Sequence, residues 1–184
     1  MIYPIYVFGQ PILRKIAKDI DKDFPNLQEF INDMFETMDK SDGVGLAAPQ
    51  IGESIRIFVV DGTPFSEDDE SMKDFHKVFI NAQIIERTGE EKIFNEGCLS
   101  LPGIREDIAR LSTIRIKYYD QDFNLIDEVF DGMKARIIQH EYDHIEGKMF
   151  IDLLSPLRKR ILKRKLNEIV KGEVETAYKI KFVK

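Results

Sequence analysis

The residues whose types and spacing point most directly to chemistry are His140-Glu141-Tyr142-Asp143-His144. On a helix, residues four apart lie on the same face, so the imidazoles of His140 and His144 can reach one metal ion. Glu141 directly follows the first histidine, where its carboxylate can act on a water molecule bound to that ion. A short HExxH pattern also arises by chance, and the plainer alternative is two histidines satisfied by hydrogen bonds. We interpret the segment as a metal site with an adjacent general base.

A catalytic metal of this kind needs a third protein ligand and one open position. One class of metalloprotease continues the pattern as HExxHxxGxxH, but this chain reads HEYDHIEGKMF, with Phe150 in place of the third histidine. Glu168, on a later predicted helix, is the best-spaced carboxylate, although it lies among lysines. That is a poor place for a buried ligand, so the remaining strong candidate is the lone cysteine, Cys98, because a thiolate binds such ions tightly. Cys98 would otherwise be a small buried side chain, or a nucleophile with His140 as its base.

A third segment, GVGLAAPQ, spans residues 43–50 and is rich in small side chains. Its two glycines allow a ligand or another backbone to approach closely, although a turn from helix to strand would explain them equally well. It is not a phosphate-binding loop, because no Gly-Lys-Ser/Thr follows. Gln50 at its end offers an amide N–H₂ group that is suited to stabilise an oxyanion.

Together, GVGLAAPQ, EGCLS and QHEYDH resemble the three motifs of the peptide deformylase family, and they occur in the family's order. The similarity extends from FGQPILRKIA to about residue 165. It implies hydrolysis of the N-formyl group on the initiator methionine of nascent polypeptides, with release of formate. It also implies one divalent metal ion per chain, held by Cys98, His140 and His144. Ferrous iron is the expected physiological metal, with zinc or nickel as substitutes.

The same resemblance implies roles for individual residues. Glu141 would act as general base and then as general acid, while Gln50 and the backbone N–H of Leu99 would stabilise the oxyanion. The methionine side chain would enter an apolar pocket that includes His140, and the substrate backbone would pair with the protein as an added strand. The expected substrate-binding residues are Val44, Gly45, Phe94, Gly97, Arg105, Met133 and Ile137. Arg110 is a candidate partner for Glu96, in a buried pair that would hold the Cys98 loop, and Asp143 is a second candidate carboxylate there.

The elements that must position these groups follow from the spacing of apolar residues. Helices are expected over residues 27–40, over 131–147 with the HExxH segment, and over 156–171, with a short helical turn near Pro11. Strands are expected at residues 55–60, 78–86, 91–95, 113–119 and 125–130, and one more near 174–184. Residues 62–74, which carry an acidic run, are expected to form a solvated insertion. The order predicts an α+β fold, in which mostly antiparallel sheets pack around the HExxH helix.

Composition limits the class of protein. The chain has 184 residues, which predicts one domain, with residues 1–165 as the catalytic part and 166–184 as the end of the last helix and a tail. One cysteine excludes an intramolecular disulfide, and no apolar run approaches the ~20 residues that span a membrane. We therefore expect a cytoplasmic protein without a membrane partner. The net charge of -6 argues against general binding to DNA.

The last predicted helix departs from this acidic balance. Between Arg158 and Lys171 it carries seven Lys or Arg residues and one acid, Glu168. It is either a surface helix, packed by an apolar side that includes Leu157 and Ile161, or a contact with ribosomal RNA, as the resemblance implies. Two rival functions also remain at this point. One is an HExxH metallopeptidase with Glu168 as third ligand, and the other is a non-catalytic ribosome-binding factor.

Overall fold

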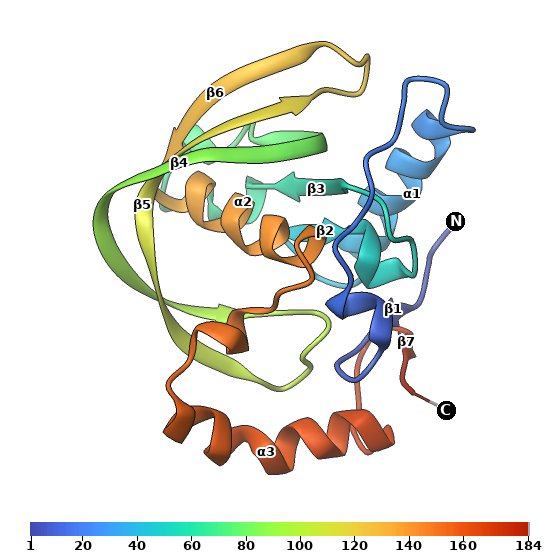
Figure 1. The fold of residues 1–184 in the computed structure, drawn as a ribbon, viewed down its shortest axis with the longest axis vertical. Helices are drawn as coiled ribbons and strands as arrows, with labels where there is room; N and C mark the ends of the chain where they lie inside the picture. Colours follow the sequence, from blue (N-terminus) through green and yellow to red (C-terminus); the bar gives the residue numbers. More distant parts are fainter. Residues whose placement is uncertain (184) are drawn as a thin grey trace.

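The computed structural model describes residues 1–183, and its main sheet has five strands in the order β2-β3-β4-β5-β6, all antiparallel (Figure 1). The strands are β2 (Gly45–Ala47), β3 (Ile57–Asp61), β4 (His76–Gly97), β5 (Arg105–Tyr119) and β6 (Leu125–Asp131). A separate parallel pair joins β1 (Ile5–Tyr6) to β7 (Ile180–Lys181). The helices are α1 (Leu27–Lys40), α2 (Gly132–Ile145) and α3 (Pro156–Lys171). The α+β fold expected from the sequence is confirmed.

Helix α2 lies inside the curve of the sheet, as Figure 1 shows. It packs against β2, β3, β5 and β6. Ala135, Ile138 and Ile145 on this helix are fully buried, in one cluster with aromatic side chains of the sheet such as Phe58 and Phe79. The HExxH segment is therefore carried by the most enclosed helix of the molecule, as expected, and its backbone is held by the core.

Strands β4 and β5 form a long hairpin, and here the predicted boundaries are wrong. The two strands expected at 78–86 and 91–95 are one strand, because the pairing with β5 shifts register at three places, including the step from Thr88 to Glu91. Irregularities of this kind bend a strand without ending it. Strand β5 begins at Arg105 instead of near residue 113. Its first half turns the charged residues Glu106 and Arg110 inward, so the apolar alternation that marks a strand is missing there.

Residues 62–74 are only partly a solvated insertion. They contain two short 3₁₀ helices, at Thr63–Phe65 and Glu70–Met72. The acidic residues 67–70 are exposed as expected. Met72 is fully buried, however, and Phe65 packs against the cluster of buried residues between α2 and the main sheet. Two apolar anchors therefore fix this segment to the body of the protein.

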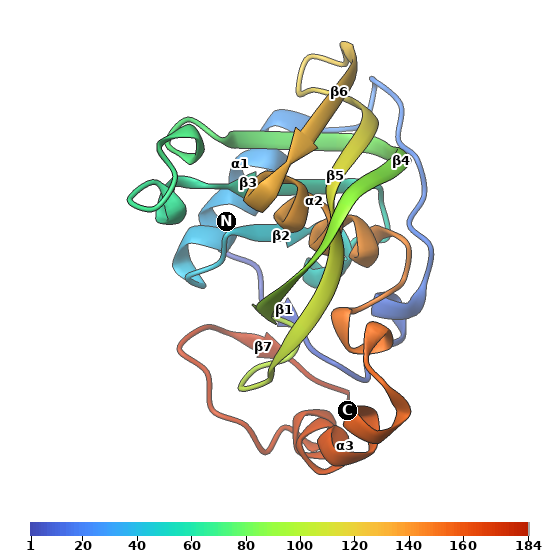
Figure 2. The same ribbon diagram turned by 90° about the vertical axis from the view of Figure 1, so that its left-hand side faces the viewer.

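The amino-terminal and carboxy-terminal segments lie side by side (Figures 1 and 2). The first helical turn is a 3₁₀ helix at Pro11–Arg14. In α3, Leu162 and Ile169 are buried, but Leu157 and Ile161 are 67% and 56% exposed, so part of the predicted apolar side faces outward. The strand predicted near 174–184 is β7, and Lys184 lies outside the described residues. No helix within residues 1–183 is long and apolar enough to cross a membrane.

Candidate metal centre

Three donor side chains from two elements meet at one point. Cys98 follows the end of β4, while His140 and His144 lie one turn apart on α2. One ligand atom from each lies within 4.8 Å of the others, and Cys98 Sγ is 3.2 Å from His144 Nε2. One thiolate and two imidazoles are a donor set that suits zinc or another transition metal. Three protein ligands also leave a position open, as a catalytic site requires.

Glu168 is not part of this group. It lies on α3, where its Oε1 atom accepts a hydrogen bond from Arg164 Nε at 2.9 Å, one turn away on the same helix. The alternative in which Glu168 serves as the third ligand is therefore wrong, because Glu168 belongs to a surface ion pair on a different element.

The orientation of His140 is set by a buried carboxylate. Its Nδ1 atom lies 2.9 Å from Glu96 Oε2, which leaves Nε2 to face the donor cluster. Burial opposes ionisation of Glu96, but hydrogen bonds from His140 and Arg110 outweigh it and hold the pKa of Glu96 well below its usual range. Burial, with a smaller effect from His140, lowers the pKa of His144 well below its ordinary value, so this imidazole is neutral and can donate a lone pair.

The pair proposed between Arg110 and Glu96 is present and is part of a larger network. Arg110 donates to both carboxylate oxygens of Glu96, at 2.7 and 3.0 Å, and to Asp143 Oδ2 at 2.8 Å. Arg136 adds a second cation, 2.7 Å from Glu96 Oε1. The network ties β4, β5 and α2 together directly behind the metal donors.

Glu141 differs from Glu96 because no arginine or histidine in the described structure donates a hydrogen bond to its carboxylate. Its side chain is buried, and among residues 1–183 its Oε2 atom has no hydrogen-bond partner. Burial raises the pKa of Glu141 to about 7, against a smaller lowering effect of His140. A carboxyl group with this pKa can both accept and release a proton at neutral pH. Gly45 packs so closely against it that a methyl group there would overlap the carboxylate.

Gln50 has a fixed orientation. Its Oε1 atom accepts a hydrogen bond from the backbone N–H of Ala47 at 2.8 Å, which requires the carbonyl end of the amide to point that way. The opposite end, Nε2, lies 3.2 Å from Ser100 Oγ and 3.6 Å from Cys98 Sγ. The amide N–H₂ group therefore faces the metal donors.

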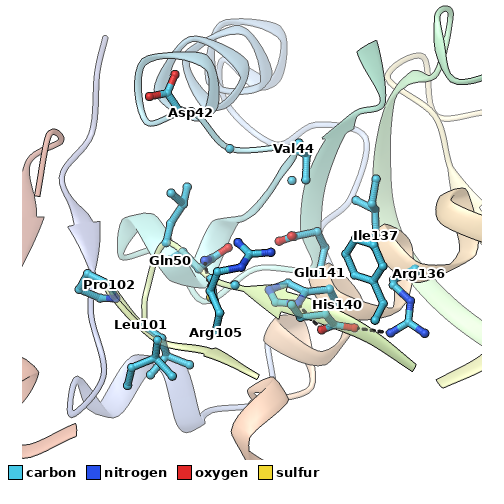
Figure 3. A pocket seen from close by; sticks show the side chains of 18 of the residues that line it. Asp42, Val44, Gln50, Leu101, Pro102, Arg105, Arg136, Ile137, His140 and Glu141 are labelled. Atoms are coloured by element: carbon cyan, nitrogen blue, oxygen red, sulfur yellow. Dashed lines mark hydrogen bonds and ion pairs between the residues drawn. The ribbon is translucent and has the colours of Figure 1, made fainter. Parts of the chain in front are cut away.

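A pocket of about 430 Å³ opens beside these groups (Figure 3). All the residues predicted for substrate binding line it, together with Gln50, Leu99, His140 and Glu141. The structure thus brings the predicted site residues together around one cavity, except His144, which is buried beside it. The wall also contains residues that were not predicted: Asp42, Phe65, Leu101, Pro102, Gly103, Ile104, Arg136 and Tyr178.

One of the unpredicted residues had a signal in the sequence. Arg136 precedes His140 by four positions, so helical spacing alone places it on the same face of α2. Tyr178 and Phe65 had no such signal, because each reaches the pocket from a segment far away in the chain. Burial raises the pKa of Tyr178 to about 12, with a smaller effect from Cys98, so its hydroxyl is protonated at neutral pH.

Comparison with known proteins gives one consistent result. The profile of the polypeptide deformylase family matches residues 2–160. The chain is 52% identical to a peptide deformylase of Christiangramia forsetii, across 99% of this chain and 96% of that protein. It is 51% identical to one from Flavobacterium johnsoniae, across the same shares of the two proteins. Among solved structures, a peptide deformylase from Legionella pneumophila superposes with a TM-score of 0.81 and 39% identity, covering 94% of this chain and 98% of that one.

Proposed function

Since the chain belongs to the peptide deformylase family, and is a metallohydrolase that removes the N-formyl group of nascent polypeptides, we propose a role for each residue around the pocket. The observation that carries this proposal is the buried, unpartnered carboxylate of Glu141, which lines the pocket beside the Cys98, His140 and His144 donors. Such a group is available to move a proton at the point where an amide would be attacked.

In this proposal Glu141 transfers the proton during the reaction. Cys98, His140 and His144 would hold a divalent ion, which would supply Lewis acidity to lower the pKa of a bound water molecule and to polarise a carbonyl. Glu141 accepts the proton from the attacking water and then donates it to the departing amine, which leaves as a free amino terminus. Its buried carboxylate, with an oxygen that has no partner among residues 1–183, suits both halves of this cycle.

Gln50 and the backbone N–H of Leu99 stabilise the charge that develops on the formyl oxygen. Support comes from the fixed direction of the Gln50 amide and from the place of both residues in the pocket wall. Donors held in advance of the reaction need no reorganisation when the charge appears, and one of them is typically worth ~10²–10³ in rate.

The methionine side chain occupies the apolar part of the pocket, against Phe94, Met133 and Ile137. The backbone of the substrate pairs with the segment at Val44 and Gly45. This is supported by the position of β2 at the edge of the main sheet. An extended peptide can add to such an edge through main-chain hydrogen bonds, which tolerate varied side chains. Gly97 and Arg105 contact the residues after the methionine.

The native metal is ferrous iron in this proposal, with zinc or nickel as substitutes. Both histidines and the thiolate are compatible with each of these ions, so the donor set alone does not select one. A thiolate ligand and ferrous iron are both sensitive to oxidation, which favours a reducing, cytoplasmic setting. Metal analysis after anaerobic purification tests this: iron should be the main metal, and zinc alone in the most active preparation would contradict it.

A matched pair of substitutions tests the site as a whole. Cys98→Ala should lose both the metal and the release of formate from a formyl-methionyl peptide. Glu168→Ala should keep both, since Glu168 pairs with Arg164 on the surface. A Cys98→Ala enzyme that retains metal and activity would overturn the assignment and favour a different third ligand. Metal without formate release in the wild-type protein would favour a non-catalytic role.

We further propose that α3 contacts the ribosome through its exposed basic residues. Arg160, Lys163 and Lys165 are exposed, and the helix has a strong positive charge in an otherwise acidic protein. Replacing these three by Glu should weaken co-sedimentation with ribosomes, and the wild-type binding should fall steeply with salt. A control with the same change in net charge replaces Lys22, Lys40 and Lys73, which are exposed elsewhere. Equal binding by both triple variants would refute the contact.

The domain organisation predicted from the sequence also remains a proposal: residues 166–184 belong to the same unit as residues 1–165. It is supported by Ile169, which is fully buried in one cluster with Val7 and Leu101. This packing is also the reason for using surface charges instead of a deletion to test α3.

A further inference from the structure

The chain does not end at α3 but returns to the active site. Gly172, with a φ of 74°, ends the helix, and the tail then runs back to pair with the amino-terminal segment (Figure 2). Two backbone hydrogen bonds fix it there, from Ile5 N to Lys179 O at 2.8 Å and from Val7 N to Lys181 O at 3.1 Å. Tyr178 lies directly before this anchored stretch.

Tyr178 reaches the loop that carries the metal-binding cysteine. Its hydroxyl donates a hydrogen bond to the backbone carbonyl of Leu99 at 2.9 Å, and its side chain lines the pocket. The sequence separation between the two residues is 79 positions, so only the tertiary fold brings them together. The tail therefore contacts the same residue whose N–H is assigned to the oxyanion.

The loop 98–101 is tethered at several points. Leu101 N donates to Cys98 O at 2.9 Å, which closes a turn, and Phe8 N donates to Ser100 O at 2.9 Å. Gln50 Nε2 contacts Ser100 Oγ at 3.2 Å. The Cys98 carbonyl and the Leu99 N–H belong to one planar peptide unit, which the Leu101 N–Cys98 O bond holds. Tyr178 holds the next unit, which contains the Leu99 carbonyl. Within residues 1–183 the Leu99 N–H donates no hydrogen bond, so it is free for a ligand in the pocket.

We propose that Tyr178 is a positioning residue, which orients the Leu99 backbone so that its N–H points at the formyl oxygen in the transition state. The N–H and the carbonyl of Leu99 lie in successive peptide units that meet at its α-carbon. The Tyr178 hydrogen bond fixes the second unit and the Leu101 N–Cys98 O bond the first, so that together they set the direction of the N–H. A donor that is fixed before the reaction stabilises developing charge better than a mobile one. The inference rests on the role proposed above for Leu99, and it extends the active site to the carboxy-terminal tail.

Tyr178→Phe tests the inference, because it removes the hydroxyl and keeps the ring. Loss of one neutral hydrogen bond should lower kcat about 3- to 10-fold. KM and metal content should stay unchanged, since the contact acts only on transition-state stabilisation. Amide hydrogen exchange of residues 98–101, which does not depend on turnover, should become faster. The matched control is Tyr3→Phe, which removes a hydroxyl bonded to Asp33 at 3.3 Å, outside the pocket, and should keep wild-type kinetics.

Gln50→Ala, measured in parallel, separates this inference from the proposal on which it rests. If Gln50→Ala loses about 10²-fold in kcat while Tyr178→Phe equals the control, the role of Tyr178 is refuted and the oxyanion assignment stands. If neither variant loses activity, both fail. A Tyr178→Phe enzyme with raised KM and unchanged kcat would show a pocket wall instead of a positioning residue, and would also overturn the inference.

Discussion

Two buried glutamates lie within one small site and have opposite surroundings. Glu96 accepts hydrogen bonds from two arginines and His140, and it stays ionised. Glu141 has an oxygen with no partner in the described structure, and burial raises its pKa to about 7. Pairs of carboxyl groups whose environments separate their pKa values in this way commonly divide between a structural and a proton-transfer role. Both residues are glutamates, so residue type does not distinguish their roles, but their hydrogen-bond partners do.

Glu141→Gln should abolish most of the activity while the metal remains. The amide keeps the size of the side chain but cannot accept the proton, so kcat should fall by ~10²–10⁴. Formate release and metal content, measured on the same preparation, check this. Because Glu141 is not among the three donors, loss of the metal together with activity would contradict its assigned role.

Gly45→Ala should disturb the same carboxylate from the opposite side. The added methyl group would overlap Glu141, and the backbone of Gly45 has no positive φ that would add strain of its own. Displacing a catalytic group by ~1 Å can cost about 10²-fold in rate, so a fall of that order is expected. The test is the kcat of a Gly45→Ala enzyme whose stable folding has been checked. Turnover near the wild-type value would contradict the prediction and show that Glu141 has room to move.

At the scale of elements, the buried ion network decides how β4, β5 and α2 fit together. Arg110 on β5 contacts Glu96 on β4 and Asp143 on α2, so a single side chain spans the three elements that carry or flank the metal donors. The cost of burying these charges is offset only while every partner remains. Strand β5 is therefore joined to β4 and α2 by polar contacts at Arg110, in a place where apolar packing would be expected.

Arg110→Ala should lower the free energy of unfolding by about 3–5 kcal/mol, because it leaves buried carboxylates without their main cation. Arg115→Ala is the matched control on the same strand: its guanidinium is exposed and pairs with Asp127 on β6, so stability should stay close to wild type. Denaturant unfolding of both variants, with metal content, checks this. Equal stability of the two variants would show that the network does not hold the site.

At the scale of the whole molecule, the metal donors join the end of the long hairpin to the central helix. The amino-terminal segment and the tail then fix the same loop from outside, through Phe8 and Tyr178. Segments from both ends of the described chain thus converge on a few residues around Cys98. The site depends on the complete fold, although its donors come from two short motifs.

Removal of the metal should lower the thermal stability of the whole chain. A ligand at 100 times its Kd stabilises the folded state by about 2.7 kcal/mol, which corresponds to roughly 5–10 °C in Tm for a chain of this size. Thermal unfolding with and without a chelator measures the shift, and added metal should restore the higher Tm. Cys98→Ala should show no response to chelator, and an equal response would place the stabilising metal elsewhere.

The sequence by itself determined the two histidine donors and the α+β class, because these depend on residue type and short spacing. Cys98, far from His140 in the chain, was one of two candidates for the third ligand, and only the resemblance of all three motifs to one family favoured it. HExxH is a property of one helical turn, and the apolar periodicity of α1 and α2 needs only local geometry. The Arg110–Glu96 pair could also be predicted from the sequence as a candidate. The reasoning is that a buried carboxylate near Cys98 needs a cation as its partner.

Only the tertiary structure decided which groups surround those donors. Strand β5 was predicted too short, since its inward Glu106 and Arg110 hide the alternation. One of the two interpretations of the last helix packs an apolar side that includes Leu157 and Ile161, but helical spacing does not show which part of that side the rest of the protein covers. Tyr178 and Phe65 reach the pocket from segments that are distant in the sequence. Contacts between such segments depend on how the whole chain packs, so a local sequence pattern does not predict them. The chemical groups of the site can be read from residue types and short spacings in the sequence. Their positions around the metal donors depend on packing between distant segments, which only the folded chain shows.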